Sequence, residues 1–292
     1  MSNLNNNKSK IFNTLKKLNL AKDSSIELFS KKTRDNNKLK VYRDKNSEVI
    51  FIDDYYIGVD EYKYGKYKEK LVPHINTTKR IYEESIDSKR RVDKYLQFVA
   101  DKNICDFGCG SGSFLSKVSP FAKNVYGIEP QNDLRQNINK NNITCYNSIN
   151  EFNKTIDAFF LFHSFEHLPD PMETLKSMYK LLKKNGNGRI IIEVPHANDF
   201  LINNLSIDSF INFTLWSQHL LLHTRESLKK FLAAAGFKNI IIEGVQRYNI
   251  ANHLNWLRHD KPSGHKEILS IFETTELVEA YSNALSRIDA ND

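Results

Sequence analysis

The sequence contains no long apolar run. Its 292 residues include no uninterrupted hydrophobic stretch near the ~18 residues that a membrane-spanning helix needs. The first ten residues, rich in asparagine and lysine, also lack the apolar core of a secretory signal peptide. We therefore expect a soluble, cytoplasmic protein.

Cysteine is scarce. The three cysteines, Cys105, Cys109 and Cys145, form no C-x-x-C pair. An odd count of cysteines without a secretion signal argues against a disulfide framework, and the spacing argues against a zinc ribbon. We expect three reduced, apolar side chains and no metal site.

Most of the chain carries no excess of positive or negative charge. The net charge is +7, but residues 1–40 hold ten Lys or Arg and three Asp or Glu, so residues 41–292 are balanced. A protein that wraps on nucleic acid carries its basic side chains across the binding face. The distribution therefore predicts no nucleic-acid partner.

The pattern divides the chain into three parts. Residues 1–76 form a basic N-terminal segment that should begin disordered, continue as a short amphipathic helix over 11–20 and end in a β-hairpin module over 38–58. Residues 77–250 form the catalytic domain, and residues 251–292 form a C-terminal loop and helix.

Residues 60–70 carry three tyrosines among charged side chains, and two readings stay open for them. They are either a solvated linker or a lid over the active site.

The catalytic part alternates strands and helices. A helix over 77–100 precedes β-rich and helical runs in turn up to residue 195, and a helix over 224–235 then leads to a β-rich run over 237–246. This order is typical of an α/β fold, in which right-handed crossovers build a parallel sheet with helices on both faces.

The central motif is Asp106-Phe-Gly-Cys-Gly-Ser-Gly112, at the end of the first strand of that sheet. Glycines at alternate positions let the backbone turn tightly and approach a ligand where any Cβ would clash. Glu129 ends the next strand, 23 residues after Asp106. An acidic side chain at that place accepts hydrogen bonds from both ribose hydroxyls of an adenosine-containing cofactor.

The same motif indicates which cofactor binds. A dinucleotide fingerprint wants Gly or Ala at its third glycine position, where this chain has Ser113. Asp106 would also repel a pyrophosphate, whereas it suits a cationic amino-acid moiety. The motif therefore favours S-adenosylmethionine over a nicotinamide dinucleotide.

These segments resemble the class I S-adenosylmethionine-dependent methyltransferases, whose sheet is Rossmann-like. DFGCGSG resembles their first motif, GIEP the acidic end of their second strand, and FHSFEHLPDP the segment after their fourth strand. Asn185-Gly-Asn-Gly188 replaces the usual Pro-Gly-Gly before the fifth strand, a departure in a turn. The resemblance implies the following cofactor-binding residues: Asp106, Gly108, Gly110, Gly112, Glu129, Pro130, Ser148 and His163.

Two later segments, WSQHLLLHTRESLKKFLAAAGF and QRYNIANHLNWLRHDKPSGH, resemble the bacterial methyltransferases that act on sugars and surface glycans. The resemblance implies a sugar or nucleotide-sugar acceptor in polysaccharide biosynthesis. Members commonly begin with a cysteine-paired zinc module, which is absent here. Class I sheets normally finish with an antiparallel pair of strands. After 237–246 we find only a helix, so the seventh strand is missing or comes from a less obvious segment.

Methylation of nucleobase amines is disfavoured. Enzymes of that kind present an Asn/Asp-Pro-Pro-aromatic motif after the fourth strand, where this chain has Phe162-His-Ser-Phe165. Their motif stacks a flipped base and holds its amine.

A histidine is the predicted catalytic base, although alignment of donor and acceptor does most of the work in methyl transfer. His219 is the first candidate, because it lies in a long aromatic insertion over 197–223, and His167 is the second. His163 and His196 also follow strand ends. Each histidine alone is more often structural, and Glu166 with His167 could instead cap the next helix.

Arg247 and Arg258 could contact an anionic substrate group such as a nucleotide diphosphate, or lie in a solvated surface loop. The sequence thus predicts a methyltransferase acting on a hydroxyl of a sugar, nucleotide-sugar or related small metabolite. The alternatives are a quinone or other aromatic O-methyltransferase, a sugar C- or N-methyltransferase, and a catalytically silent binding protein that keeps the cofactor fold.

Overall fold

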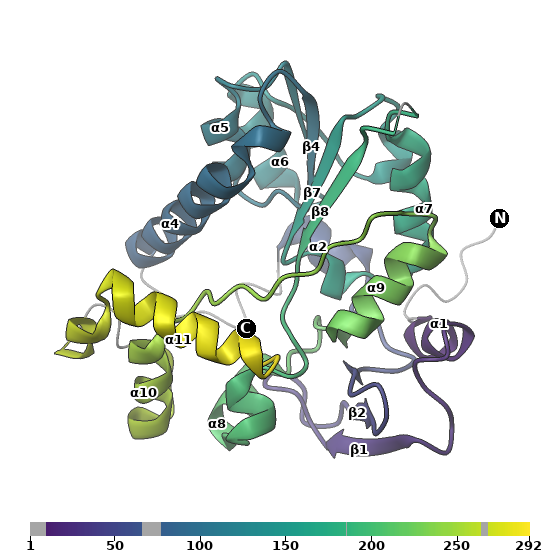
Figure 1. Ribbon diagram of the computed structural model, residues 1–292. Helices are drawn as coiled ribbons and strands as arrows, with labels where there is room; N and C mark the ends of the chain where they lie inside the picture. Colours follow the sequence, from purple (N-terminus) through teal and green to yellow (C-terminus); the bar gives the residue numbers. More distant parts are fainter. Residues whose placement is uncertain (1–9, 66–76, 185, 264–267) are drawn as a thin grey trace. The chain divides into compact units, whose positions relative to one another are not determined.

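The computed structural model describes residues 10–65, 77–184, 186–263 and 268–292 (Figure 1). Contacts between residues group the chain into two compact units. The first unit comprises residues 57–194, and the second combines residues 10–56 with residues 195–292, in each case within the described ranges. The predicted three parts, divided at 76 and 250, are therefore grouped differently, because the N-terminal part and the chain after 195 share one unit.

The first unit is built on a five-stranded sheet with the order β6-β5-β4-β7-β8, and every pairing is parallel. Strand β7 reads AFFLF and is buried throughout, as expected of a parallel strand covered on both faces. The strands are β4 Asn103–Phe107, β5 Asn124–Ile128, β6 Thr144–Tyr146, β7 Ala158–Phe162 and β8 Arg189–Glu193.

Helices cover both faces of this sheet, with α4 and α5 on one side and α7 on the other (Figure 1). A core on the α4 and α5 side joins Val99, Phe114 and Phe160, all fully or almost fully buried. The first unit contains α2 Val59–Tyr64, α4 Thr77–Tyr95, α5 Ser113–Val118, α6 Asn132–Lys140 and α7 Pro171–Leu181, with short 3-10 turns η1 Leu96–Phe98, η2 Ile149–Glu151 and η3 Phe165–His167.

The predicted Rossmann-like α/β sheet with helices on both faces is confirmed. All five strands and the helices between them match the predicted runs within a few residues. The three cysteines are free and buried, as predicted. Within residues 60–70, positions 60–64 belong to α2, and 66–70 lie outside the described residues, so the linker and lid readings stay open.

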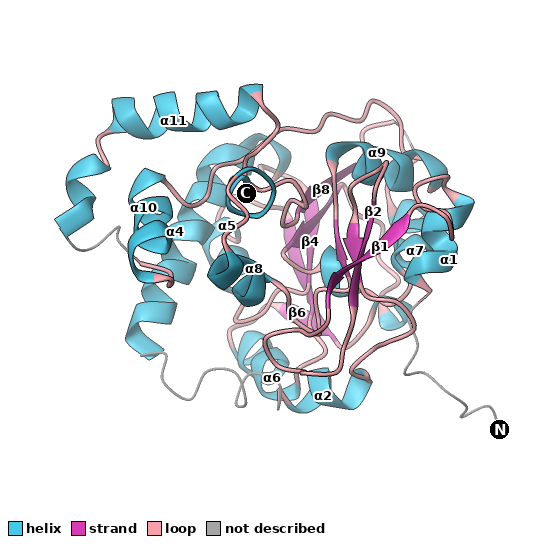
Figure 2. Cartoon of the chain, turned by 90° about the horizontal axis from the view of Figure 1, so that it is seen from below, coloured by secondary structure: helices cyan, strands magenta, loops and turns pink. Residues whose placement is uncertain are grey.

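The second unit is built on a four-stranded antiparallel sheet with the order β1-β2-β3-β9 (Figure 2). The predicted hairpin is confirmed in β2 Val41–Asp44 and β3 Ile50–Phe51. Its partners were not predicted: β1 Ile26–Ser30 precedes the hairpin, and β9 Leu221–Leu222 comes from the aromatic insertion. The hairpin is thus completed by a strand 170 residues further along the chain.

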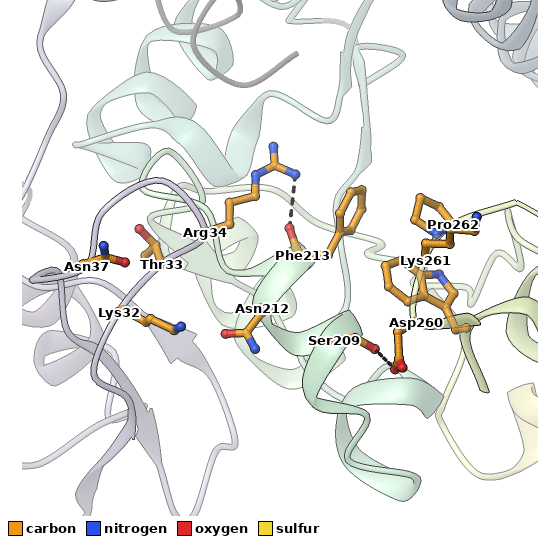
Figure 3. A pocket seen from close by; sticks show the side chains of 11 residues that line it. Lys32, Thr33, Arg34, Asn37, Ser209, Asn212, Phe213, Asp260, Lys261 and Pro262 are labelled. Carbon is orange, nitrogen blue, oxygen red and sulfur yellow. Dashed lines mark hydrogen bonds between the residues drawn. The ribbon is translucent and has the colours of Figure 1, made fainter. Parts of the chain in front are cut away.

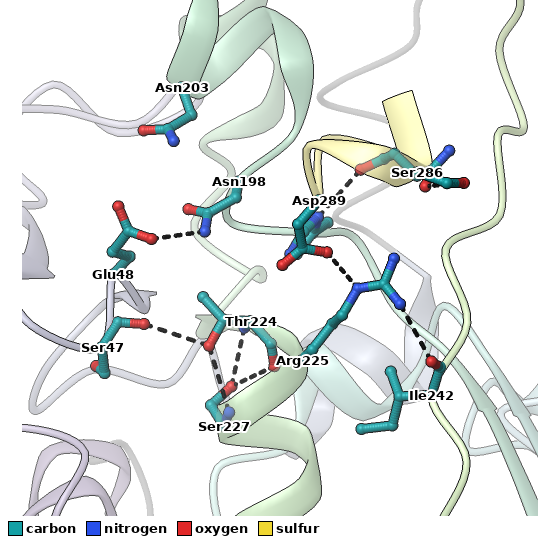
Figure 4. Close-up of polar contacts among 12 residues, drawn as sticks. Ser47, Glu48, Asn198, Asn203, Thr224, Arg225, Ser227, Ile242, Ser286 and Asp289 are labelled. Carbon is teal, nitrogen blue, oxygen red and sulfur yellow. Dashed lines mark hydrogen bonds and ion pairs between the residues drawn. The ribbon is translucent and has the colours of Figure 1, made fainter. Parts of the chain in front are cut away.

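Polar contacts also join the two ends of the chain within this unit (Figure 4). The Asn198 amide donates to Glu48 at 2.7 Å, and the Thr224 hydroxyl donates to the Ser47 carbonyl at 3.2 Å. Within the late chain, Arg225 of α9 pairs with Asp289. The two hydrogen bonds to Ser47 and Glu48, together with the shared sheet, explain why the N-terminal segment belongs with the late chain.

The helices of the second unit begin with α1 Ile11–Lys17, which confirms the predicted amphipathic helix and buries Ile11 and Leu15 completely. Thr224 caps α9 by a capping box, close to the predicted start. The remaining elements are the π-helix η4 Phe200–Asn204, α8 Asp208–Thr214, α9 Arg225–Ala234, α10 Ile250–His259, η5 Ile268–Phe272 and α11 Thr275–Arg287.

One strand prediction is wrong. Residues 237–246 form no strand, although the run is rich in β-branched side chains. No ladder pairs with it in the described chain; Ile241 is 84% exposed, and the Ile242 carbonyl accepts a bond from Arg225 instead. Propensity alone does not make a strand without a neighbouring edge to pair with. The described chain therefore supplies five strands to the parallel sheet. The sequence predicted that the seventh strand would be missing or come from a less obvious segment, and within the described residues the sixth strand is missing as well.

Among the described residues, no helix combines the length and apolarity that crossing a bilayer requires.

Candidate functional site

The strand order of the first unit fixes where a ligand can bind. The chain runs from β4 outward through β5 to β6, then crosses to β7 and continues to β8 on the other side. In a parallel sheet, the crevice for ligands lies beyond the carboxyl ends of the strands at the point where the direction reverses. That point lies between β4 and β7, the two strands that the glycine motif and the histidine segment follow.

The glycine turn after β4 has a backbone that other residues rarely adopt. Gly108, Gly110 and Gly112 have φ of +72°, +56° and +78°. At Gly108 a Cβ would lie 2.6 Å from the Cβ of Ser164, which follows β7, so the two segments approach closely only because this residue is glycine. The Gly108 amide donates to the Ile128 carbonyl at 2.8 Å, which holds the turn at the end of β5.

Glu129, which follows β5, is buried beside this turn. One carboxylate oxygen accepts from the Gly110 amide at 2.8 Å, and the other accepts from the Gln131 amide at 2.8 Å. The two bonds fix the orientation of the carboxylate at the carboxyl edge of the sheet. The predicted acidic residue and glycine turn are therefore in direct contact.

Asp106 lies in β4 and is 3% exposed. Its Oδ1 has no hydrogen-bond partner in the described part of the chain. Burial, reinforced by Glu129 and opposed by Arg91, raises the pKa of Asp106 to about 8. A buried carboxyl with an unsatisfied oxygen suits a cationic group, because an ammonium would both satisfy the oxygen and stabilise its ionised form.

Two further predicted residues follow neighbouring strands. Pro130 comes directly after Glu129, and Arg135 holds the carbonyls of both residues at 3.0 and 2.8 Å. Ser148 follows β6 and begins the turn η2, where its carbonyl accepts from the Glu151 amide at 3.2 Å. Both therefore lie at the same carboxyl edge as the glycine turn.

His163 directly follows β7 and has a left-handed backbone, with φ of +50°. Its amide donates to the Glu193 carbonyl of β8 at 2.9 Å. A non-glycine residue in this conformation is uncommon and is held here by the strand beside it. The backbone at His163 is thus turned sharply at the switch point.

The segment after His163 places Glu166 between two imidazoles. Glu166 is 1% exposed, and its Oε1 lies 3.7 Å from Nδ1 of His163 and 3.8 Å from Nε2 of His167. The His167 ring also meets Tyr62 of α2 edge to face at 6.5 Å. The helix-capping alternative is wrong, because the side chain of Asp170 caps α7 through the Glu173 amide.

A brace that the sequence analysis missed holds α4 against the edge strand β8. Arg90 donates both Nη atoms to Glu193 at 3.1 and 2.9 Å, Arg91 donates Nε at 3.0 Å, and the Tyr95 hydroxyl donates at 3.2 Å. Burial acts to raise the pKa of Glu193, but the bonds and charges of the two arginines outweigh it and hold this pKa below its ordinary value. The one feature of the sequence that could have indicated this contact is Glu193, an acidic residue at the end of the apolar strand segment RIIIE.

The same helix also reaches the glycine turn, because the Ser111 hydroxyl bonds to Glu84. Helix α4 is thus tied to the turn at one point and to β8 at another. It forms a fixed wall at the carboxyl edge of the sheet.

The other two histidines belong to the second unit. His219 receives its orientation from the Thr214 carbonyl, 2.8 Å from Nδ1, and its ring meets Trp216 edge to face at 5.5 Å. A carbonyl can only accept, so Nδ1 carries the proton and Nε2 of the neutral ring is the basic nitrogen. His196 is half-buried, with Nδ1 bonded to the Asn291 carbonyl at 3.1 Å, and its partial burial lowers its pKa.

The two arginines proposed for an anionic group differ in environment. The guanidinium of Arg247 lies 5.0 Å from the ring centre of Tyr248. Arg258 lies in the last turn of α10 and is exposed. Both residues belong to the second unit.

Comparison with known proteins agrees with this geometry. A family model described as a methyltransferase domain matches residues 80–241. An uncharacterized methyltransferase of Schizosaccharomyces pombe is 24% identical over 166 residues, covering 51% of this chain and 57% of that protein. A tRNA U34 carboxymethyltransferase of Aliarcobacter butzleri is 24% identical over 205 residues, covering 63% of this chain and 65% of that protein. The chain thus spans about three fifths of the length of these curated relatives.

Among solved structures, a SAM-dependent methyltransferase from Archaeoglobus fulgidus has the same fold. The TM-score is 0.50 at 19% identity, and the match covers 73% of this chain and 93% of that one. The family model spans more than half of the 292 residues and contains the whole glycine turn, Glu129 and the segment after β7. This chain therefore belongs to the methyltransferase-domain family.

Proposed function

We propose that this protein transfers a methyl group from S-adenosylmethionine to a hydroxyl of a sugar, nucleotide-sugar or related small metabolite, in surface-glycan biosynthesis. The observation that carries the methyl-transfer part is the contact of the glycine turn with Glu129 beside the buried carboxyl of Asp106. The acceptor part rests on the charge of the chain and on the resemblance of its later segments.

The residues at the carboxyl edge of the parallel sheet fit the cofactor by their chemistry. Glu129 would accept bonds from the ribose hydroxyls, and the ionised carboxylate of Asp106 would face the ammonium of the methionine part. The glycine turn lets the backbone approach, and Pro130, Ser148 and the backbone at His163 border the same edge. When bound, the cofactor supplies a methyl group on a positively charged sulfur.

The first role of the chain in the reaction is alignment. Helix α4 is fixed to β8 through Glu193 and to the glycine turn through Glu84. Because a methyl transfer is an in-line displacement, a wall that keeps donor and acceptor aligned provides most of the acceleration.

The second role is removal of a proton from the acceptor hydroxyl. His219 is suited to it, because the Thr214 carbonyl fixes the tautomer whose Nε2 takes a proton. His167, with Glu166 3.8 Å from its Nε2, is the second candidate. In either case the proton passes from the hydroxyl to an imidazole as the new bond to the acceptor oxygen forms.

A small acceptor is favoured over RNA. The Aliarcobacter butzleri relative is a tRNA enzyme, yet beyond residue 40 this chain has no net positive charge with which to follow a phosphate backbone. The rival acceptors are an aromatic hydroxyl, such as that of a quinone, and a carbon or nitrogen of the sugar. A catalytically silent protein that only binds the cofactor is the remaining alternative.

The experiment is to measure release of S-adenosylhomocysteine with a panel of nucleotide-sugars, free sugars, a quinol and bulk tRNA. We expect turnover with members of the sugar panel, and at limiting S-adenosylmethionine we expect turnover to fall strongly in Glu129→Ala, the variant that tests the cofactor site. Product analysis then locates the methyl group on oxygen, nitrogen or carbon. Turnover with tRNA or quinol alone would contradict the proposed acceptor, and cofactor binding without turnover on any substrate would favour the silent alternative.

A further inference from the structure

A groove lies within the second unit. Its volume is about 490 Å³, which is within the range of small-molecule sites. Three segments form its walls: the loop over 32–37, the helix α8, and the end of α10 with the three residues that follow it (Figure 3). All three belong to the same compact unit, so the groove is defined within that unit alone.

The groove is positively charged. Lys32, Arg34 and Lys261 line it, against one carboxylate, that of Asp260. That carboxylate accepts a hydrogen bond from the Ser209 hydroxyl at 2.7 Å (Figure 3). In the described part of the chain, neither lysine ammonium forms an ion pair. Two ammonium groups on opposite walls are therefore available for an anion.

Arg34 is held in a fixed position. Its guanidinium lies 5.1 Å from the ring centre of Phe213 and 4.6 Å from that of Trp216, and Nη1 donates to the Phe213 carbonyl at 3.2 Å. The neighbouring carboxylate, Asp35, instead accepts from the amide and hydroxyl of Ser217. Since a guanidinium carries five N–H donors and one is used here, the planar fork retains donors suited to phosphate oxygens.

The groove also offers groups suited to a ring and to hydroxyls. Phe213 is a large aromatic side chain that is 45% exposed, and it packs at 5.3 Å against Trp256 in the groove wall. The exposed amides of Asn37 and Asn212 line the groove and have no hydrogen-bond partner in the described part of the chain. Aromatic surface flanked by cations and open amides is the combination that stacks a base, pairs with phosphates and reads ring edges.

We propose that this groove binds the nucleoside diphosphate part of a nucleotide-sugar. The inference rests on the proposed function and makes it narrower, because it assigns the acceptor's carrier to Lys32, Arg34 and Lys261 instead of Arg247 and Arg258. Phe213 stacks with the base, and the three cations neutralise the diphosphate. A single strand of RNA would use the same chemistry over a longer path, and the test separates the two.

The test is calorimetric titration of the full chain with UDP, GDP, inorganic pyrophosphate, uridine and a ten-nucleotide RNA, without cofactor. We expect UDP or GDP to bind, pyrophosphate to bind more weakly and uridine to bind weakest. The double variant K32A/K261A should weaken the diphosphate affinity at least tenfold and reduce its dependence on salt. Arg34→Lys keeps the positive charge but removes the planar guanidinium that can donate two parallel hydrogen bonds. It should weaken diphosphate binding by a smaller factor than K32A/K261A.

Lys229→Ala is the matched control, since Lys229 is an exposed lysine of α9 in the same unit and lies outside the groove. It should leave diphosphate affinity unchanged, and circular dichroism should show that all variants keep their fold. Affinity retained in K32A/K261A would overturn the groove assignment, while turnover of nucleotide-sugars by the wild type would still support the proposed function. Tight binding of the RNA, with no binding of either nucleotide, would overturn the ligand class.

Discussion

The two units of this chain are assembled in opposite ways. The first unit takes its parallel sheet from one continuous stretch of chain. The pairs β4–β5, β5–β6 and β7–β8 join strands that follow one another in the sequence, and the central pair β4–β7 skips two strands. The second unit pairs β3, near residue 50, with β9, near residue 221, and so depends on both ends of the chain. One continuous stretch of chain thus produces the edge proposed for the cofactor, whereas pairing between two distant stretches produces the unit that carries the proposed base and groove.

This difference has a consequence for stability. Each unit has its own buried core, around Phe160 in the first and around Leu15 and Phe51 in the second. Both tryptophans, Trp216 and Trp256, lie in the second unit, so tryptophan fluorescence follows that unit alone. The two cores can therefore be perturbed and observed separately.

The largest expected effect comes from emptying one core at a time. Leu15→Ala removes a fully buried side chain of α1 and should destabilise the second unit by about 2 to 5 kcal/mol. Denaturant titration followed by tryptophan fluorescence should show the loss, while calorimetry with S-adenosylhomocysteine at low denaturant should show unchanged affinity. The exposed Lys17→Ala in the same helix is the control and should alter neither measurement.

Phe160→Ala empties the core of the first unit instead, and it should lower the free energy of unfolding of that unit by about 3 to 5 kcal/mol. Cofactor affinity should fall and the fluorescence transition should stay in place. If both variants shifted the fluorescence transition equally, the two units would unfold as one, and the comparison between them would fail.

The next effect concerns the chemistry assigned to the second unit. His219→Ala should lower kcat at least about 10²-fold, because the proton of the acceptor hydroxyl loses its base, while cofactor affinity stays intact. His259→Ala is the control, since His259 is an exposed histidine at the end of α10. Near-normal turnover in His219→Ala, together with a large loss in His167→Ala, would move the base to the first unit.

A smaller effect is the pH dependence of the first unit. The pKa of Asp106 is raised to about 8, so the folded protein holds a proton there that the unfolded chain releases near pH 4, and stability should fall as pH rises between these values. An ammonium favours the ionised carboxylate, so the affinity for S-adenosylhomocysteine should increase from pH 6 to 7.5, by up to about tenfold per unit. Asp106→Asn should remove this increase. A wild-type affinity independent of pH would show that Asp106 does not meet the cofactor.

The smallest effect is expected at the start of the chain. Deleting residues 1–10 should leave thermal stability and cofactor affinity nearly unchanged, because this segment is rich in Asn and Lys and has few apolar side chains to bury. Deleting residues 1–20 removes Ile11, Leu15 and Leu20, all buried, and should destabilise the second unit while leaving cofactor affinity intact. Equal losses from both deletions would show that the first ten residues contribute to the fold.

The sequence predicted the first unit more completely than the second. Strands, helices and the glycine turn of the first unit were predictable, because parallel strands read as continuous apolar runs and the turn needs glycine at fixed positions. The pairing of β3 with β9 was not, since a two-residue strand leaves no periodic signal. The strand prediction over 237–246 was wrong for the opposite reason, because these residues have strand propensity but no neighbouring strand in the described chain pairs with them. The Arg90 and Arg91 brace on Glu193 was missed, because charges on a helix face look like solvated surface until a strand end is placed beside them.

The central claim is that the carboxyl edge of the parallel sheet binds S-adenosylmethionine through the glycine turn and Glu129. It is tested most directly by calorimetric titration of S-adenosylhomocysteine into the wild type, Glu129→Ala and the control Glu173→Ala, an exposed glutamate in the first turn of α7. We expect Glu129→Ala to weaken binding by about 1.5 to 3 kcal/mol, because the ribose hydroxyls lose their acceptor, and Glu173→Ala to bind like the wild type. Unchanged affinity in Glu129→Ala, with the fold intact by circular dichroism, would contradict the claim.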